Sequence, residues 1–404
     1  MKTLAIAGTF DTKGKELSYI KQLAEKRGLN TLCIHTGVFE AALKVDISNQ
    51  EIVKEAGRDL AEIVAERDRA VATELLAQGM ELLLPRLYNE EKFDAILSIG
   101  GSGGTSIVTP GMRQLPIGVP KLMVSTMASG NVAQYVGISD IIMMPSITDV
   151  EGLNSISRRI FSSAVNAIAG MLNYDEVIEP DEKPLLAATM FGVTTPCIKT
   201  AKAYLESKGY EVLVFHATGA GGKSMESLIE AGFIKGVLDI TTTEWCDEVV
   251  GGVLNAGPHR LEAAGRKGIP QVVSVGALDM VNFGSYDAVP VQFKNRLLYK
   301  HNPTVTLMRT TKGELSEIGS IIAEKLNTAM GLTVLMLPLK GVSGIDVEGQ
   351  PFYDPEADNV LFDTLRGHIN DTVDIIELEY AINDDAFAVA AAQKLIDLLE
   401  EAKR

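Results

Sequence analysis

Cysteine is scarce in this sequence of 404 residues, which has only Cys33, Cys197 and Cys246. They lie far apart and form no CxxC pair, so neither a disulfide framework nor a cysteine zinc site is indicated. Long apolar runs are absent too. None approaches the roughly 20 residues that cross a membrane, and the run after Met1 is too short for a secretion signal. These absences predict a reducing, cytoplasmic location.

Positive charge is also in short supply. The sequence has 37 Lys and Arg against 53 Asp and Glu, which gives a net charge of −16. This excess of acid disfavours a broad nucleic-acid footprint and an anionic membrane surface, although a local basic pocket for one phosphate group is compatible with it. The hydrophobic content of 46% is typical of a globular protein, and a chain of 404 residues favours two domains.

Several catalytic signatures are missing. No GxGxxG follows the first expected strand, and no helix carries HExxH. The segment "HATGAGGKSME" (216–226) contains GKS, but Ala217 stands where a nucleotide-binding P-loop needs glycine. It also follows the second expected strand of its domain, whereas a P-loop usually follows the first. We therefore interpret it as a glycine-rich anion-binding loop, with Lys223 available for charge.

Short apolar runs alternate with helical patterns along the chain. Within each run the apolar residues are consecutive and not interrupted by a polar residue at every second position, as expected of strands covered on both faces. The runs occupy residues 3–8, 30–35, 94–100, 120–126 and 140–146. Residues 14–28 between the first two runs place Leu17, Ile20 and Leu23 at helical spacing, with Gly28 as a stop. Such alternation predicts βαβ units and a parallel sheet.

The pattern restarts after residues 173–184, a charged segment with two prolines that marks the best domain boundary. At an offset of 181, nine identities occur in 34 ungapped positions, including Phe10 with Phe191 and His35 with His216. We also expect these pairs of counterparts: 93–102 with 234–243, 117–126 with 267–276, and 140–149 with 304–313. The prediction is an α/β protein of two tandem, duplicated, doubly wound Rossmann-like domains with mainly parallel sheets, 1–178 and 184–404.

Glycine gathers at "LSIGGSGGTSIV" (97–108), between an expected strand and a helix. Ligands of parallel α/β sheets bind beyond the carboxyl ends of the strands, where bare backbone N–H groups and a helix dipole favour phosphate. The second such loop is "STMASGN" (125–131). Lys13 would neutralise phosphate charge, and Asp11 would hold a ribose hydroxyl or Mg²⁺. The alternative is that the glycines only permit tight turns and packing.

Polar residues also follow strands of the second domain. Those favoured for acid–base work or for recognition of a phosphorylated or carboxylated substrate are His301, Asp279, Asn282, Arg309 and Lys223. Each alone could instead anchor a loop. His35 and His216 end equivalent strands, which favours a shared structural role. Cys246 could be a nucleophile, but an inert buried cysteine is the commoner case.

Several motifs occur together in an order that identifies a family. The chain resembles a widely distributed family of uncharacterised bacterial proteins, and the N-terminal inhibitory region of a plant relative, the tomato mosaic virus resistance protein. The segments that carry this resemblance are "AGTFDTKGKE", "GGSGGTSI", "STMASGNVAQYVG", "HATGAGGKSME", "GALDMVNFG" and "GVSGID". They extend over nearly the whole chain.

The resemblance implies a two-domain protein that binds ATP in its N-terminal domain and forms a homodimer. Mg²⁺ is the ion that Asp11 would hold, as the alternative to a ribose hydroxyl. The plant relative also has a barrel domain, so a separate barrel-domain protein is an expected partner. Carried onto this sequence, the nucleotide-binding role falls on Thr9, Asp11, Thr12, Lys13, Gly101, Ser102, Gly103, Gly104, Thr105, Ser129, Gly130 and Asn131.

Two classes of function remain open at this point. In the first, bound ATP orders the N-terminal domain and supports a regulatory or partner-binding role. In the second, the C-terminal domain is an ATP-dependent transferase or hydrolase that acts on a small anionic metabolite in its cleft. Turnover of ATP in the presence of magnesium would discriminate between them.

Overall fold

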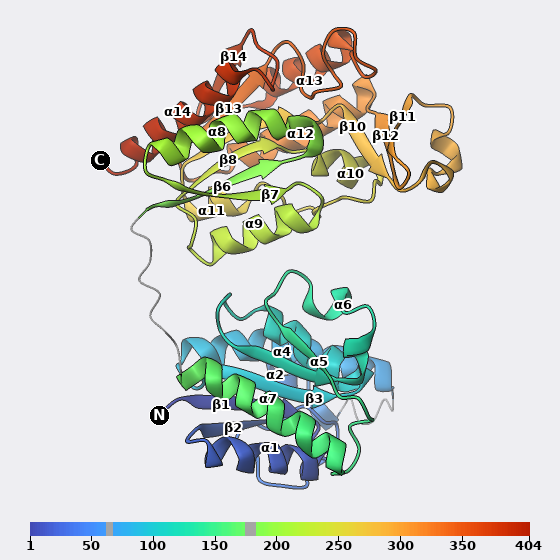
Figure 1. Cartoon of the computed structure of the whole chain (residues 1–404), viewed down its shortest axis with the longest axis vertical. Helices are drawn as coiled ribbons and strands as arrows, with labels where there is room; N and C mark the ends of the chain where they lie inside the picture. Colours follow the sequence, from blue (N-terminus) through green and yellow to red (C-terminus); the bar gives the residue numbers. More distant parts are fainter. Residues whose placement is uncertain (62–67, 174–182) are drawn as a thin grey trace. The chain divides into compact units, whose positions relative to one another are not determined.

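The structure is a computed structural model that describes residues 1–61, 68–173 and 183–404. The chain divides into two compact units, Met1–Glu179 and Pro180–Arg404 (Figure 1). Most of the boundary segment expected at 173–184 lies outside the described residues. Both units are built around a mainly parallel sheet with helices on its two faces, which confirms the predicted fold class.

The N-terminal sheet has five parallel strands in the order β2-β1-β3-β4-β5. Ala5 and Ala7 face one side and Leu4 and Ile6 the other, and all four are fully buried because helices cover both faces. The strands are β1 (Thr3–Gly8), β2 (Asn30–His35), β3 (Ala95–Gly100), β4 (Lys121–Ser125) and β5 (Ile142–Pro145).

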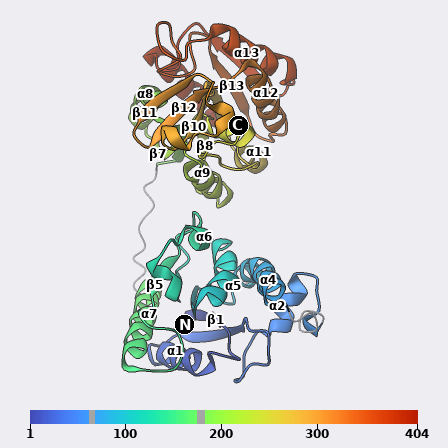
Figure 2. The same cartoon turned by 90° about the vertical axis from the view of Figure 1, so that its right-hand side faces the viewer.

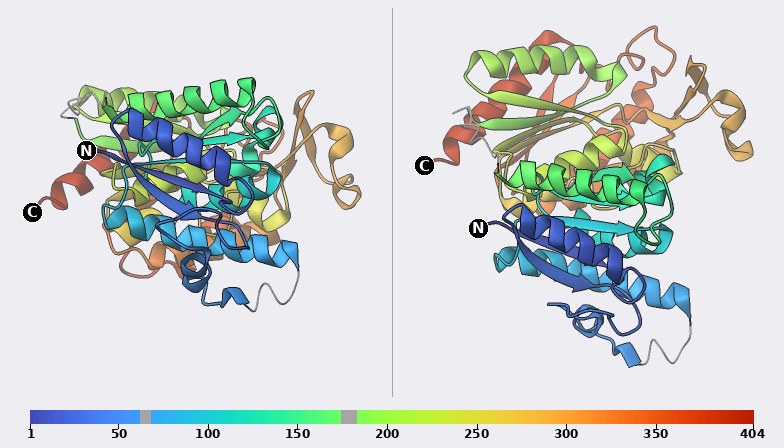
Figure 3. Two further views of the ribbon diagram at one scale, coloured as in Figure 1. Left: turned by 90° about the horizontal axis from the view of Figure 1, so that it is seen from below. Right: turned by 60° about the horizontal axis from the view of Figure 1, so that its bottom comes forward.

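Helices α1 (Gly14–Lys26) and α7 (Ser155–Asn173) cover one face of this sheet and lie side by side (Figure 3). In Figure 2 strand β1 separates them from the helices of the other face. Those helices are α2 (Asn49–Glu55), α4 (Arg69–Asn89) and α5 (Ser102–Arg113). The chain between β4 and β5 adds the 3₁₀ helix η1 (Thr126–Ser129) and the short α6 (Ala133–Val136).

The C-terminal sheet has six parallel strands in the order β14-β13-β9-β8-β6-β7. Read from β7 and numbered along its own unit, this order is 2-1-3-4-5-6, so its first five strands repeat the N-terminal order. The strands are β6 (Leu185–Met190), β7 (Glu211–His216), β8 (Gly236–Thr241), β9 (Gln271–Gly276), β13 (Thr333–Pro338) and β14 (Asp374–Leu378).

The expected counterpart of β5 at residues 304–313 is wrong. That run forms β12 (Val305–Arg309), which pairs antiparallel with β10 (Met280–Phe283) and β11 (Leu298–Asn302) in a separate three-stranded sheet. The place beside β9 belongs to β13. The 3₁₀ helices η3 (Tyr286–Ala288) and η4 (Val291–Phe293) lie within the same excursion.

Helices α8 (Thr195–Ser207) and α14 (Asp385–Glu401) pack together on one face of the C-terminal sheet, with η2 (Gly192–Thr194) leading into α8. The remaining helices pack in the clusters of the opposite face: α9 (Ala220–Glu230), α10 (Glu244–Val250), α11 (Ala263–Lys267), α12 (Lys312–Asn327) and α13 (Pro355–His368). Among the described residues, no helix is long and apolar enough to cross a membrane.

Candidate functional site

The N-terminal sheet has its topological switch point between β1 and β3. The strand after β1 in the chain, β2, lies on one side of β1, and the next strand, β3, lies on the other side. The loops that follow β1 and β3 therefore flank one crevice at the carboxyl edge. Helix α5 starts directly after β3 with Gly101 as its N-cap residue, and no side chain caps it. Its first N–H groups and its positive dipole end are thus available to an anion.

The glycines at this helix start differ in what they do for the fold. A Cβ at Gly100 would lie 3.0 Å from the Cα of Gly104, so this glycine permits close packing. At Gly101, Gly103 and Gly104 a Cβ would come no closer than 3.5 Å to a neighbouring atom, and none of the three has a positive φ. Packing and turn geometry therefore explain why position 100 is glycine, but they do not explain the other three glycines.

Two cations stand near the crevice. The position of a Cβ at Gly103 is 3.5 Å from Nη2 of Arg69, the first residue of α4. Lys13, the N-cap residue of α1, follows the loop after β1. Within the described part of the chain, neither the Arg69 guanidinium nor the Lys13 ammonium group has a hydrogen-bond or ion-pair partner. Arg69 had no sequence signal, because nothing in "ERDRAV" relates it to a loop 34 residues away.

The other candidates of this unit have internal roles. The Asp11 carboxylate accepts N–H hydrogen bonds from Thr12 (2.8 Å) and Phe39 (3.1 Å), and so joins two loops. The Thr12 hydroxyl bonds that of Thr9 (2.9 Å). The Thr105 hydroxyl donates to the Gly101 carbonyl (2.7 Å) and pairs with that of Ser125. Ser129 ends η1 and is exposed, as are Gly130 and Asn131 after it, and the Asn131 side chain accepts a hydrogen bond from the N–H of Ala133.

Gly100, Ser102 and Gly104 also match the GxSxG spacing of a nucleophile elbow. An elbow holds its serine on a sharp, strained turn between strand and helix. Ser102 is exposed, begins α5 and has no positive φ. The geometry therefore favours Ser102 as a hydrogen-bond donor at a helix start rather than as a nucleophile.

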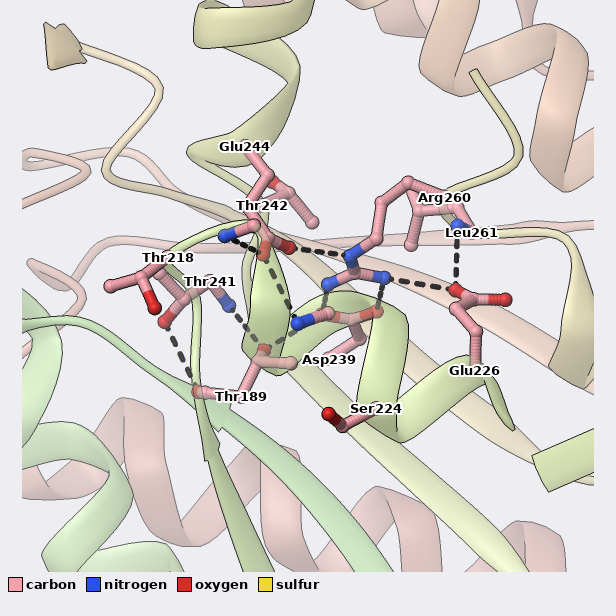
Figure 4. A network of polar contacts seen from close by, with 12 residues as sticks. Thr189, Thr218, Ser224, Glu226, Asp239, Thr241, Thr242, Glu244, Arg260 and Leu261 are labelled. Carbon is pink, nitrogen blue, oxygen red and sulfur yellow. Dashed lines mark hydrogen bonds and ion pairs between the residues drawn. The ribbon is translucent and has the colours of Figure 1, made fainter. Parts of the chain in front are cut away.

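The glycine-rich loop of the C-terminal unit binds an anion, and that anion belongs to the protein. Oε1 of Glu244 accepts hydrogen bonds from the N–H groups of Gly219 (2.7 Å) and Gly222 (3.1 Å) at the start of α9, and Oε2 accepts one from Nε of Arg260 (2.7 Å) (Figure 4). The Glu244 side chain has no exposed area. Lys223, expected to supply charge here, is exposed and makes no side-chain contact with Glu244.

Arg260 is the centre of a buried polar network at the switch point of the C-terminal sheet, between β6 and β8. Its guanidinium forms a bidentate pair with Asp239 (2.5 and 2.7 Å) and also reaches Glu226 (3.3 Å). The hydroxyl of Thr189 donates to Asp239 (2.7 Å). Burial opposes the charge of Arg260, but the three carboxylates keep its pKa well above the ordinary value. Internal side chains thus fill the usual ligand position of this sheet.

Two of the five predicted catalytic residues lie in one cluster. Nη2 of Arg309 binds Asp358 (2.7 Å) and Asp346 (3.3 Å), and the nearby Asp279 accepts a hydrogen bond from Ser343 (2.8 Å). Burial raises the pKa of Asp279 to about 7 and that of Asp346 to about 9. Burial thus favours the protonated form of the carboxyl groups that face this guanidinium.

The other three predicted residues lie elsewhere. The Asn282 amide and N–H bind Asp247 (2.9 and 2.6 Å), a carboxyl whose pKa is raised by burial to about 7. His301 is exposed on β11, where its ring contacts Tyr299, and Lys223 is exposed on α9. No single site assembles all five residues. The prediction assumed strand ends of a parallel sheet, but Asn282, His301 and Arg309 lie on β10, β11 and β12 of the antiparallel sheet.

A pocket of about 500 Å³ opens beside the Arg309 cluster, beyond the carboxyl ends of β13 and β14. Asp358 lies in its wall, together with Lys340, Tyr353 and Asn359. The Lys340 ammonium pairs with Glu379 (2.7 Å). In the part of the chain that the structure describes, no group of His, Cys, Asp and Glu is placed to hold a metal ion.

Of the two histidines, His35 has the expected structural role, whereas His216 is exposed at the end of β7. His35 is buried, accepts the N–H of Phe10 (3.1 Å) at Nδ1 and donates from Nε2 to the Phe39 carbonyl (2.7 Å). The rings of Phe10 and His35 are in contact, as are those of Phe191 and His216. Cys246 is buried, which raises its pKa far above the ordinary value and makes it inert as a nucleophile.

The sequence reasoning missed the roles of Glu244, Asp346 and Asp358. One signal could have found Glu244. When 93–102 is aligned with 234–243, the next position pairs Gly103 with Glu244. A carboxylate thus stands in the second unit where the first has a bare glycine. The aspartates have no such signal, because their partner Arg309 comes from a strand of the antiparallel sheet.

Comparison with known proteins shows the family. Residues 2–177 and 183–399 match the N-terminal and C-terminal domains of the "Uncharacterised protein family (UPF0261)". A UPF0261 protein of Clostridium tetani is 54% identical over 402 residues, covering 99% of this chain and 100% of its own. One from Rhizobium meliloti is 45% identical over 400 residues, covering 98% and 99%.

A plant relative matches over a shorter part of its length. The ToMV resistance protein Tm-1(GCR237) of Solanum lycopersicum is 43% identical over 342 residues, which cover 83% of this chain and 45% of the plant protein. The resemblance found from the motifs is thereby confirmed. The chain belongs to the uncharacterised protein family UPF0261.

Proposed function

We propose that the N-terminal unit binds the phosphate groups of a nucleotide at the start of helix α5. The observation that carries the proposal is that Gly101, Gly103 and Gly104 are bare where the fold itself does not require glycine. Glycine within a helix costs about 1 kcal/mol relative to alanine, so two of them in one first turn need another explanation. Close approach of a ligand to the backbone supplies one.

The surroundings support a ligand with several negative charges. Arg69 and Lys13 provide two cations near the crevice that have no partner among the described residues, and the dipole of the 12-residue α5 adds positive potential. The family resemblance favours ATP as the nucleotide. In this proposal bound ATP orders the loops after β1 and β3 and supports a regulatory role, in which the protein associates with a second copy or with a separate barrel-domain protein.

The test is calorimetric titration with ATP and magnesium. The wild type is expected to bind, and Gly103→Val is expected to lose binding because its side chain occupies the space in front of the N–H groups. Gly170→Val is the matched control: Gly170 lies on α7, and a Cβ there would meet no other residue within 4 Å. Equal binding by Gly103→Val and the wild type would overturn the proposal.

The alternative function is chemistry in the C-terminal unit. It is favoured by the pocket of about 500 Å³ whose wall includes Asp358, a carboxyl of the Arg309 cluster whose pKa is raised by burial. A protonated carboxylic acid beside a pocket can act as a general acid. Magnesium-dependent consumption of ATP that Asp358→Asn abolishes would favour this function, whereas tight binding of ATP without consumption would favour the first.

A further inference from the structure

We infer that the C-terminal unit has an anion site of its own that Glu244 occupies permanently, so that the chain binds one nucleotide and not two. The inference rests on the proposed function of the N-terminal unit. It starts from the duplication, because two copies of one nucleotide-binding fold are expected to bind two ligands unless one copy is blocked. Gly103 and Glu244 hold the same position after the equivalent strands β3 and β8.

The cradle around Glu244 has the parts of a phosphate or carboxylate site. Two N–H groups come from the first turn of α9, a helix of 11 residues, and a guanidinium comes from Arg260 on the far side of the carboxylate. Figure 4 shows Glu244 and Arg260 meeting within the network of the C-terminal unit. Together the donors satisfy both carboxylate oxygens, as an external anion would be satisfied.

The glycines of this cradle are fitted to Glu244 and not to an open cavity. A Cβ at Gly222 would overlap the Glu244 carboxylate, and one at Gly221 would overlap the His216 carbonyl. Gly219 has φ +81°, which favours glycine by itself. Each glycine of the loop thus has a reason inside the protein, unlike Gly101, Gly103 and Gly104.

Stoichiometry provides the first test. Titration of the full chain with ATP and magnesium is expected to give one site per chain, and Gly103→Glu is expected to abolish it by supplying the first unit with the carboxylate of the second. Two sites per chain would overturn the inference. If the titration detects no ATP site, the proposed function of the N-terminal unit is overturned instead. The rescue experiment below then tests by itself whether Glu244 occupies an anion site.

Chemical rescue provides the second test. Glu244→Ala removes the internal anion. The thermal unfolding midpoint of this variant is therefore expected to lie below that of the wild type and to rise by several degrees when formate is added. Trp245, the only tryptophan of the sequence, is buried beside Glu244 and reports on this unit by fluorescence. Glu230→Ala, which removes an exposed partner of Arg266, controls for general effects of salt. Equal responses of both variants to formate would overturn the inference.

A conservative variant keeps the test valid if Glu244→Ala does not fold. Glu244→Gln retains the shape of the side chain but places a neutral amide in the cradle. Its midpoint is expected to fall without recovery in formate, because the space is filled. Recovery of the Glu244→Gln midpoint in formate beyond that of Glu230→Ala would contradict an anion site at this position.

Discussion

The two units of the chain each have a glycine-rich helix start, and the two starts are used differently. At α9 the glycines accommodate an internal carboxylate, and substitution of any of them meets protein atoms or an unfavourable φ. At α5 three glycines face no such obstacle. A glycine-rich loop therefore indicates a ligand only where the fold leaves the glycines unexplained. Four predictions test this difference between the units.

The largest effect is expected from Arg260→Leu. It leaves Asp239, Glu244 and Glu226 without their buried counter-charge, and removal of one partner from a buried ion pair costs about 3–5 kcal/mol. Urea unfolding followed by Trp245 fluorescence measures the loss. Arg266→Leu is the control, because Arg266 is 54% exposed and its ion pairs contribute about 1 kcal/mol or less. Losses of equal size would contradict the role assigned to the buried network.

The second effect is the contrast between Gly222→Ala and Gly103→Ala. The methyl group at position 222 must displace Glu244, which we expect to destabilise the C-terminal unit by about 1–3 kcal/mol. At position 103 it makes only an ordinary contact with the Arg69 guanidinium, and the higher helix propensity of alanine adds up to about 1 kcal/mol. Urea unfolding followed by circular dichroism compares the two. Destabilisation by Gly103→Ala would show that the fold requires this glycine.

The third prediction concerns pH. Burial raises the pKa of Asp247 and Asp279 to about 7 and that of Asp346 to about 9, so between about pH 4 and these values the folded C-terminal unit binds more protons than its unfolded chain. The stability from these groups is complete below about pH 4 and is lost as pH rises from there to 7 for Asp247 and Asp279 and to 9 for Asp346, by about 1.4 kcal/mol per pH unit for each proton.

The N-terminal unit is expected to respond in the opposite direction. Burial opposes ionisation of Asp94 and Asp140, but their ion pairs with Lys2 and Lys121 lower both pKa values, so stability is lost as pH falls through them. Unfolding at several pH values, with Trp245 reporting on the C-terminal unit alone, separates the two responses. Asp346→Asn should flatten the alkaline loss, and an unchanged slope would refute the assignment.

The smallest effect is expected from the cations near α5. Lys13→Ala or Arg69→Ala should weaken ATP binding roughly tenfold, since each is a flexible cation that contributes on the order of 1 kcal/mol. Calorimetric titration measures the change, with Lys15→Ala on the neighbouring turn as the control. If Lys15→Ala weakened binding as much as Lys13→Ala, the effect would come from net charge and not from position.

Much of the fold could be predicted because buried parallel strands appear as apolar runs and because the second unit repeats the first. The run 304–313 misled because β12, like β13, contains consecutive apolar residues, and composition does not show which sheet a strand joins. Similarly, Arg260, Glu244 and Gly219 meet through the fold, and no local pattern relates them. The carboxyl edge was predictable from the strand order, whereas the partners at that edge were not.

The exchange of Gly103 for Glu244 has a consequence for how duplicated domains diverge. Codons for glycine and glutamate can differ at a single base. One such change in a doubled gene would give one copy an internal counter-ion and leave the other copy open, with no rearrangement of the backbone. The blocked copy would then gain stability from the position where its sister binds a ligand, and its sequence would be free to acquire a separate role.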